Sequence, residues 1–146
     1  MFDTVVVATD GSESVSRAVE CALDLAARFE ATVHALYVVD EGRVESLPDR
    51  LHDDVRNALD EQGESAIDGI VELNESRDEP VDLKTAVRAG RPAQQIVGYV
   101  RDTEADAVVM GTRGRDGEHS FLVGSVAEDV VRTCPAPVLT VRQLEE

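Results

Sequence analysis

Apolar and β-branched residues gather in five short runs along the chain, and each run predicts a β-strand. The run from Thr32 to Val39 is apolar except for Thr32 and His34, which is typical of a strand buried on both faces of a parallel sheet. The expected strands are residues 4–8, 32–39, 81–87, 107–110 and 138–142.

Between these runs, apolar residues recur every three or four positions, which predicts amphipathic helices. A first helix follows the turn residues 10–12, and one long helix is expected from Asp49 to Ser76, with Gly63 and Gly69 as weak points because glycine disfavours a helix interior. Residues 40–48 are expected to form a loop. The expected inward positions of these two helices are Val15, Ala18, Val19, Ala22, Leu23, Ala26 and Phe29, and then Leu51, Val55, Leu59, Ala66, Ile70 and Leu73.

Two further helices follow the third and fourth strands. Pro92 stands in the first turn of one of them, where proline is favoured. Ser125 and Glu128 fit the capping-box pattern S-x-x-E, which predicts that Ser125 caps the last helix. Pro135 and Pro137 end that helix before the last strand. The inward positions of the helix that opens at Pro92 are Ala93, Ile96, Val97 and Val100.

Strands that alternate with helices predict one α/β domain over residues 1–146, a doubly wound five-stranded parallel sheet in the order 3-2-1-4-5 with helices on both faces. In this order the winding reverses between strands 1 and 4, and ligands bind beyond the carboxyl ends of the strands at such a reversal. We therefore expect a binding crevice formed by Ala8, Thr9 and Asp10 on one side and by Met110 and Gly111 on the other.

A glycine-rich segment lies between the fourth strand and the last helix. Gly111 and Gly114 have no Cβ, so backbone N–H groups there can approach a phosphate closely, and the helix that begins at Ser125 adds unpaired N–H groups and the positive end of its dipole. The pattern favours an oxyanion-binding loop; the alternative is that the glycines serve only a tight turn and Ser125 only its own helix. The segment also holds three potential cations, Arg113, Arg115 and His119.

The chain of 146 residues carries a formal charge of −16, from 30 acidic residues against 14 Lys and Arg. This balance argues against a nucleic acid or an anionic membrane surface as a general partner. The acidic residues are spread along the whole chain and Lys84 is the single lysine, which favours adaptation to a high-salt cytoplasm, where screening is strong. An ordinary acidic cytosolic protein is the alternative.

The cysteines and histidines form no cluster in the sequence. Cys21 and Cys134 stand far apart, so we expect two buried thiols, with neither a metal site nor a disulfide framework. His34 is expected in the sheet core and His52 at a solvated helix start. No basic and apolar leader opens the sequence, and no apolar stretch reaches the roughly 20 residues that span a bilayer, so we expect a cytoplasmic protein.

Catalytic candidates are few. Asp10, His119 and Ser120 could act as a base or nucleophile, yet no acidic residue is placed to orient His119, and the P-loop pattern G-x4-G-K-[ST] is absent. We therefore expect no enzyme, or at most a slow one. A response-regulator receiver would need an Asp after the third strand, where residues 87–90 offer none, and the segment after the first strand is too acidic for the phosphate loop of a flavodoxin-like carrier.

Several of these segments together resemble the universal stress protein family, and the resemblance covers essentially the whole chain. The complete glycine pattern is similar to that of the ATP-binding branch of the family. The segments are Ala8-Thr-Asp-Gly-Ser12, Gly90-x-Pro92, Val108-Val-Met-Gly111, the pattern G-x2-G-x9-G-S from Gly111 to Ser125, and Cys134-Pro-Ala-Pro-Val-Leu-Thr-Val141.

The resemblance implies an ATP site and assigns its two sides. From the residues alone, Asp10 at a strand end can accept hydrogen bonds from an adenine amino group or a ribose hydroxyl, or it can cap the first helix. The residues implied on the adenine and ribose side are Ala8, Thr9, Asp10, Val38, Met110 and Gly111. Those implied at the ribose and phosphates are Gly114, Gly124, Ser125 and Val126, with Arg113 as an addition.

A bound triphosphate needs compensation for its charge beside Glu128 and the other acidic residues. We expect Mg²⁺ or Mn²⁺ held mainly by the phosphate oxygens, together with the loop arginines and screening by salt. The hydroxyl of Ser125 cannot fully serve both as helix cap and as phosphate ligand.

The last strand, Val138 to Arg142, is expected at a sheet edge, where an unpaired apolar strand needs a cover. The resemblance implies homodimers built through this strand; the alternative is shielding by the tail from Gln143 to Glu146. The function that the resemblance implies is that of an ATP-binding stress-response protein, a nucleotide-dependent regulator or sensor. A nucleotide-free interaction module of the same fold is the alternative.

Overall fold

One parallel sheet forms the centre of the computed structural model, which describes residues 2–10, 16–112 and 124–142. Its strand order is β3-β2-β1-β4-β5, and every neighbouring pair is parallel. The predicted fold class and strand order are therefore confirmed. The strands are β1 (Thr4–Thr9), β2 (Thr32–Asp40), β3 (Asp82–Gly90), β4 (Ala107–Gly111) and β5 (Val138–Val141).

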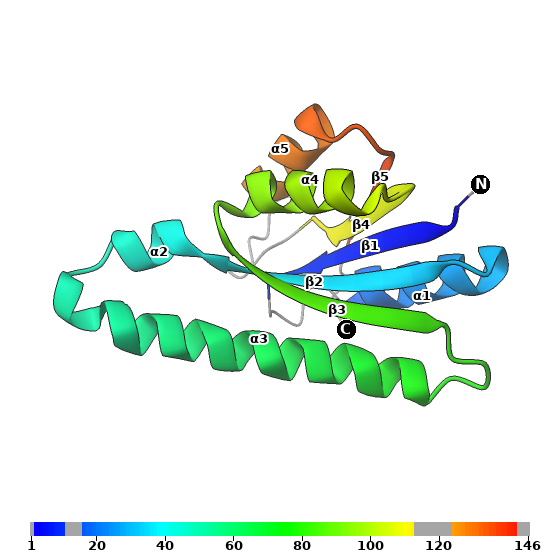
Figure 1. The fold of residues 1–146 in the computed structure, drawn as a ribbon, viewed down its shortest axis with the longest axis horizontal. Coiled ribbons are helices and arrows are strands. Elements are labelled where there is room, and N and C mark those ends of the chain that lie inside the picture. Colours follow the sequence, from blue (N-terminus) through cyan, green and yellow to red (C-terminus); the bar gives the residue numbers. More distant parts are fainter. Residues whose placement is uncertain (1, 11–15, 113–123, 143–146) are drawn as a thin grey trace.

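Helices cover both faces of the sheet (Figure 1). One core cluster joins the sheet to α1 and α3, and a second joins it to α4 and α5. A short helix, α2, and one turn of 3-10 helix, η2, connect β2 to α3. The bounds are α1 (Ser16–Phe29), α2 (Glu41–Glu45), η2 (Asp49–Leu51), α3 (His52–Glu75), α4 (Pro92–Thr103) and α5 (Ser125–Thr133).

The central strands are buried on both faces, as the continuous apolar runs predict. Along β1, Val5 and Val7 belong to the core on the α1 and α3 side, whereas Val6 and Ala8 belong to the core on the α4 and α5 side. Successive side chains of a strand point to opposite faces, so one apolar run supplies both cores.

The segment between β2 and α3 corrects the prediction of a loop over residues 40–48. The Asp40 carboxylate accepts a hydrogen bond of 3.0 Å from the Gly42 amide and so caps a short helix. Val44 of this helix is fully buried in a cluster with Tyr37 and Leu59. Asp40 and Val44 are residue types that suit a helix cap and a buried position, but a helix of five residues is too short to show a hydrophobic period in the sequence.

The exposure of Phe29 and the bounds of β3 also differ from the prediction. Phe29, expected to face inward, is 46% exposed because it is the last residue of α1, and its ring meets the ring of Phe2 at 5.0 Å. Strand β3 begins one residue later than expected and continues to Gly90, because its pairing with β2 is unbroken as far as Asp40.

Gly63 is a required contact rather than a weak point of the long helix. It lies against the ring of Tyr37 on β2, and a Cβ at this position would stand 2.3 Å from the Cδ2 atom of that ring. The Tyr37 hydroxyl donates a hydrogen bond of 2.8 Å to the Leu59 carbonyl, one turn earlier on α3. The missing side chain therefore sets how closely α3 approaches the sheet.

Cys21 and Cys134 are free thiols, and both are half-buried, so they are less enclosed than expected. Across the described ranges, no helix combines the length and the apolar character that a bilayer span requires.

Candidate functional site

The reversal of winding falls between β1 and β4, which are neighbours at the centre of the sheet. Ala8 stands opposite Met110 in their register. The chain leaves β1 through Thr9 and Asp10, and it leaves β4 through Gly111. The two strand ends that the sequence assigned to one crevice are therefore side by side.

The start of α5 is joined to the end of β4 by backbone hydrogen bonds. The Gly124 amide donates to the Thr112 carbonyl at 2.7 Å, and the Thr112 amide donates to the Val141 carbonyl of β5 at 3.2 Å. A Cβ on Gly124 would lie 2.9 Å from the Thr112 carbonyl oxygen, which real Cβ atoms essentially never do. Glycine at 124 therefore allows the helix to begin directly beside the strand end.

Gly124 and not Ser125 is the N-cap of α5, which corrects the capping-box prediction. The Gly124 carbonyl accepts the first intrahelical hydrogen bond, of 2.9 Å from the Glu128 amide, and no side chain of a described residue caps the helix. Ser125 is the first helical residue and is exposed. Its hydroxyl therefore does not cap the helix, and the expected conflict between capping and phosphate binding does not arise.

The amide groups of the first turn of α5 point out of the helix toward its N-terminal side. An α-helix provides no internal acceptor for the N–H groups of residues 125–127, and its dipole places partial positive charge there. Glu128, the acidic residue of this turn, is exposed, and its carboxylate lies 4.0 Å from the Arg132 guanidinium. The end of the helix that adjoins β4 is thus suited to an anion.

Four of the implied site residues come from four different elements and meet in one apolar cluster. Ala8, Val38 and Met110 are buried members of the core on the α4 and α5 side, and Val126 packs against it half-buried. The sheet contributes the first three and α5 the fourth. The structure therefore brings together apolar residues from both sides of the implied site.

The polar candidates at the strand ends lie at the same edge. Thr9 is buried and Asp10 is half-buried, and both interact with other groups of the protein. Arg113, Arg115, Gly114, His119 and Ser120 fall outside the described residues, so these candidates stay predictions. Thr112, which anchors Gly124 through its carbonyl, was not singled out in the sequence because a backbone acceptor leaves no side-chain signal.

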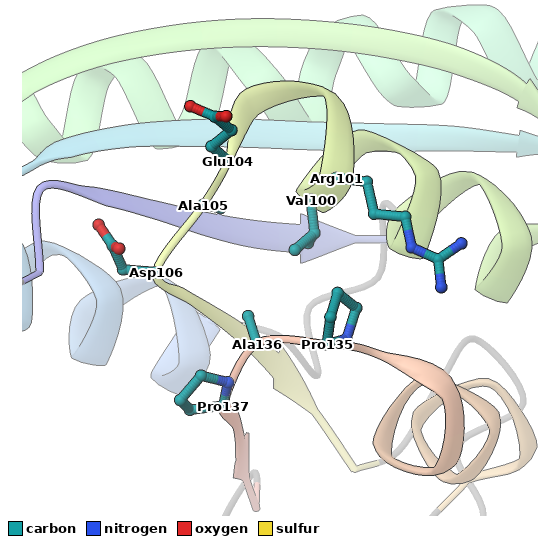
Figure 2. A pocket seen from close by; sticks show the side chains of 8 residues that line it. All are labelled: Val100, Arg101, Glu104, Ala105, Asp106, Pro135, Ala136 and Pro137. Atoms are coloured by element: carbon teal, nitrogen blue, oxygen red, sulfur yellow. The ribbon is translucent and has the colours of Figure 1, made fainter.

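An open hollow of about 360 Å³ lies at the opposite edge of the sheet, away from these residues. Figure 2 shows it between the end of α4 and residues 135–137. The Asp106 carboxylate on its border accepts hydrogen bonds from the Asp3 amide at 2.7 Å and the Thr4 amide at 3.0 Å. The Asp106 carboxylate therefore fixes the start of β1, which is a structural role.

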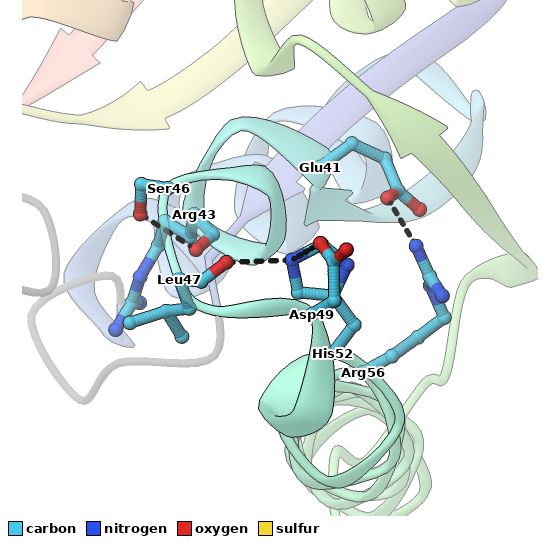
Figure 3. Close-up of polar contacts among 7 residues, drawn as sticks. All are labelled: Glu41, Arg43, Ser46, Leu47, Asp49, His52 and Arg56. Carbon is cyan, nitrogen blue, oxygen red and sulfur yellow. Dashed lines mark hydrogen bonds and ion pairs between the residues drawn. The ribbon is translucent and has the colours of Figure 1, made fainter.

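A polar junction fixes α2 against the start of α3 at the carboxyl end of β2 (Figure 3). The Arg56 guanidinium donates to the Glu41 carboxylate at 2.8 Å, and the His52 Nε2 atom donates to the Leu47 carbonyl at 2.7 Å. His52 was expected at a solvated helix start; it is half-buried, and its hydrogen bond ties together the chain around η2. The hydrogen bond was not visible from the sequence because its acceptor is a backbone atom.

His34 lies on β2 with its ring half-buried against α4. Its Nδ1 atom and the Tyr99 hydroxyl share a hydrogen bond of 2.7 Å. Burial lowers the pKa of His34, the charge of neighbouring Lys84 lowers it further, and Asp82 opposes both. Within the part of the chain that the structure describes, no group of three or more His, Cys, Asp or Glu side chains could hold a metal ion.

The strand order and the reversal between β1 and β4 define a doubly wound α/β domain with its candidate site at the carboxyl edge of the sheet. The family model of the universal stress proteins matches residues 1–142. The chain belongs to the universal stress protein family.

Individual relatives agree with this assignment. The universal stress protein MJ0531 of Methanocaldococcus jannaschii is 34% identical over 144 residues, which cover 98% of this chain and 84% of that protein. The solved universal stress protein UspA of Lactobacillus plantarum has a TM-score of 0.80 at 28% identity, covering 97% of this chain and 98% of that one. A universal stress protein crystallised in complex with cAMP has a TM-score of 0.69 at 26% identity, covering 98% of each chain.

Proposed function

We propose that this protein binds ATP at the carboxyl edge of its sheet and acts in stress response as a nucleotide-dependent regulator or sensor. The observation that carries the proposal is the position of the α5 N-terminus, which Gly124 holds directly beside the end of β4. Unpaired amides and the helix dipole make this position favourable for phosphate groups. The structural relative in complex with cAMP supports a purine nucleotide as the ligand.

The described residues fit such a ligand in two ways. The cluster of Ala8, Val38, Met110 and Val126 supplies an apolar border, and Asp10 stands at the strand end where it can accept hydrogen bonds. We assign the phosphate groups to the amides of the first turn of α5. We propose that Mg²⁺ or Mn²⁺ accompanies the nucleotide and is held mainly by phosphate oxygens.

Two matched glycine substitutions test this site. Gly124→Ala places a Cβ against the Thr112 carbonyl and displaces the start of α5, whereas the space around Gly98 in α4 is open. We expect Gly124→Ala to weaken ATP binding roughly tenfold, about 1.4 kcal/mol, and Gly98→Ala to leave it unchanged. Isothermal titration with ATP and Mg²⁺ in buffer of high salt measures both. Equal affinities in two variants that both fold would contradict the site.

Removing the divalent metal tests the metal proposal separately. ATP should bind more weakly in the presence of EDTA, because the metal neutralises phosphate charge near an acidic protein. If the affinity does not change, the nucleotide binds without the metal.

We further propose that the protein binds ATP without hydrolysing it efficiently. Protein purified without added nucleotide should release ATP or AMP when it is denatured, and a nucleotide-free interaction module should release neither. Bound ATP that is converted to ADP within one purification would favour the slow ATPase instead.

The edge strand β5 is proposed to join two copies of the chain. Leu139 of this four-residue strand is 45% exposed, and an uncovered apolar edge invites strand pairing. Multi-angle light scattering at high salt should give the mass of a dimer for the wild type and of a monomer for Leu139→Asp. A monomeric wild type would refute this interface.

The charge of −16 leads us to propose a cytoplasm of high salt as the working environment. At about 1 M salt the screening length falls to roughly 3 Å, which removes most of the repulsion among surface carboxylates. The free energy of unfolding should therefore rise between about 0.1 M and about 2 M KCl. An ordinary acidic protein would show little change over this range.

A further inference from the structure

We propose that the open edge of β3, with Lys84 and Arg88, binds an extended acidic peptide segment of a partner protein by strand addition. This surface lies at the other end of the sheet from β5 and does not depend on the nucleotide site.

The backbone of β3 is suited to accept a further strand. It pairs with β2 over all nine residues, Asp82 to Gly90, without a bulge, and within the described residues it has no other neighbour in the sheet. Six of these nine residues are exposed. Half of the N–H and C=O groups of an edge strand point outward, so a strand of this length and regularity offers a template for pairing.

The charges on β3 differ from those of the molecule as a whole, because two cations stand on this strand against the single carboxylate of Asp82. Lys84 is the single lysine in a chain of charge −16, and Arg88 stands four residues later on the same face of the strand. Their Cα atoms are separated by roughly 13 Å, the rise of four strand residues. Among the described residues, Lys84 makes no ion pair. Two acidic residues four positions apart on an added strand would meet both cations.

Arg88 is already held in place for such a contact. Its guanidinium lies 5.0 Å from the centre of the Tyr99 ring, and the Tyr99 hydroxyl is anchored to His34 at 2.7 Å. The Asp102 carboxylate is 3.8 Å from the guanidinium, but both side chains of this pair are well exposed, and such pairs are weak. An incoming carboxylate can therefore replace Asp102 without reordering the arginine.

The opposite face of β3 adds an apolar contact. Val87 is 56% exposed on the α3 side of the strand, next to exposed Thr85 two positions earlier. An added strand with acidic residues on one face and β-branched residues on the other matches both faces, because cross-strand pairs of this kind are favourable.

The competing explanation is that Lys84 and Arg88 only protect an edge strand from self-association. Natural proteins place charged residues, above all lysine, on exposed edges for that purpose. The two explanations differ in whether the wild type binds an acidic strand, and binding assays can therefore separate them.

The probe is the fluorescein-labelled peptide Thr-Glu-Val-Thr-Val-Glu-Val-Thr, measured by fluorescence anisotropy at about 0.15 M salt, where distant carboxylates are largely screened. We expect saturable binding to the wild type and at least a roughly tenfold loss of affinity for Lys84→Glu combined with Arg88→Glu. Arg28→Glu combined with Arg132→Glu, in the last turns of α1 and α5, is the charge-matched control and should bind like the wild type. A peptide of the same composition with its glutamates on opposite faces should bind more weakly.

Two N-methylated peptides test strand addition itself. In each, every second amide is methylated, and the two peptides carry the methyl groups in opposite phase. Only one phase removes the hydrogen bonds to β3, so one peptide should lose binding and the other should keep it. Equal affinities of the two peptides overturn strand addition.

Self-association provides the remaining outcome. If the wild type does not bind the acidic peptide, while Lys84→Ala combined with Arg88→Ala forms larger assemblies in light scattering, the two cations are protective and the proposal is wrong. Neither assay uses nucleotide, so its result is independent of the proposed ATP site.

Discussion

The two faces of β2 are attached to their helices in different ways. On the α3 side, the Tyr37 ring is fully buried and lies against Gly63 with no room for a single added carbon. On the α4 side, half-buried His34 meets the Tyr99 hydroxyl, with the Arg88 guanidinium above the tyrosine ring.

The comparison separates two ways of fixing a helix on a sheet. Close packing is sensitive to volume and indifferent to pH, whereas a polar contact is sensitive to protonation and tolerates small changes in volume. The close-packed face carries the longest helix, and the polar face adjoins the basic edge of β3. Substitutions on the α3 side should therefore reduce the free energy of unfolding the most. The effects of substitutions on the α4 side should depend on pH.

The largest effect is expected for Gly63→Ala. The new Cβ meets the Tyr37 ring, and both α3 and the buried ring must shift, which should reduce the free energy of unfolding by about 2–3 kcal/mol. Gly69→Ala in the same helix meets nothing within 4 Å and should raise it by roughly 0.5–1 kcal/mol. Urea unfolding of the two variants measures both. Stabilisation by both substitutions would show that the α3 contact is not close-packed.

Tyr37→Phe is expected to have the next largest effect. It keeps the ring against Gly63 and removes only the hydrogen bond to the Leu59 carbonyl, so the loss should be about 1 kcal/mol and independent of pH. Urea unfolding at two pH values checks this. If the loss in the free energy of unfolding varied with pH, the α3 side of β2 would not differ from the α4 side in the way described.

Tyr99→Phe should cost slightly less, roughly 0.5–1 kcal/mol, because its hydroxyl is bonded to a half-buried ring. The loss should change with pH, since it leaves the His34 Nδ1 atom without this partner and alters the cost of protonating the ring. The same unfolding series on Tyr37→Phe is the matched control.

The smallest effect concerns the titration of His34. Its pKa in the folded protein is lowered from the ordinary value of 6.5, first by burial and then by Lys84. Between the lowered pKa of His34 in the folded protein and its ordinary pKa in the unfolded chain, the unfolded chain binds more protons. The contribution of His34 to the free energy of unfolding therefore falls as the pH decreases through this range. His34→Gln should remove that component, and Lys84→Gln should shrink it. NMR titration of the His34 ring protons checks the folded pKa directly, and a value at or above 6.5 would contradict the assignment.

Much of the fold follows from the order of apolar runs, because each strand and each long helix carries its own period. The sequence does not reveal that Gly63 faces Tyr37, since a glycine inside a helix shows no preference for any partner until the sheet is placed. The short α2 was missed for a different reason: its stability comes from the Asp40 cap and the burial of Val44, not from a repeated pattern.

The candidate site was predictable where it depends on topology. The pairing of Ala8 with Met110 follows from the strand order, and the structure shows it. The N-cap of α5 was placed one residue late, because Gly124 and Ser125 both suit a helix start and only the approach to Thr112 decides between them. Backbone acceptors of this kind are invisible in a sequence.

Thr112 receives a hydrogen bond at its carbonyl from Gly124 and donates one from its amide to Val141. A single residue thus links the edge strand β5 to the start of α5 through its two flanking peptide groups. If β5 slides against β4, either one of these bonds must stretch or the helix must travel with the strand. A movement of the edge strand β5 is therefore transmitted to the end of β4 and to the start of α5.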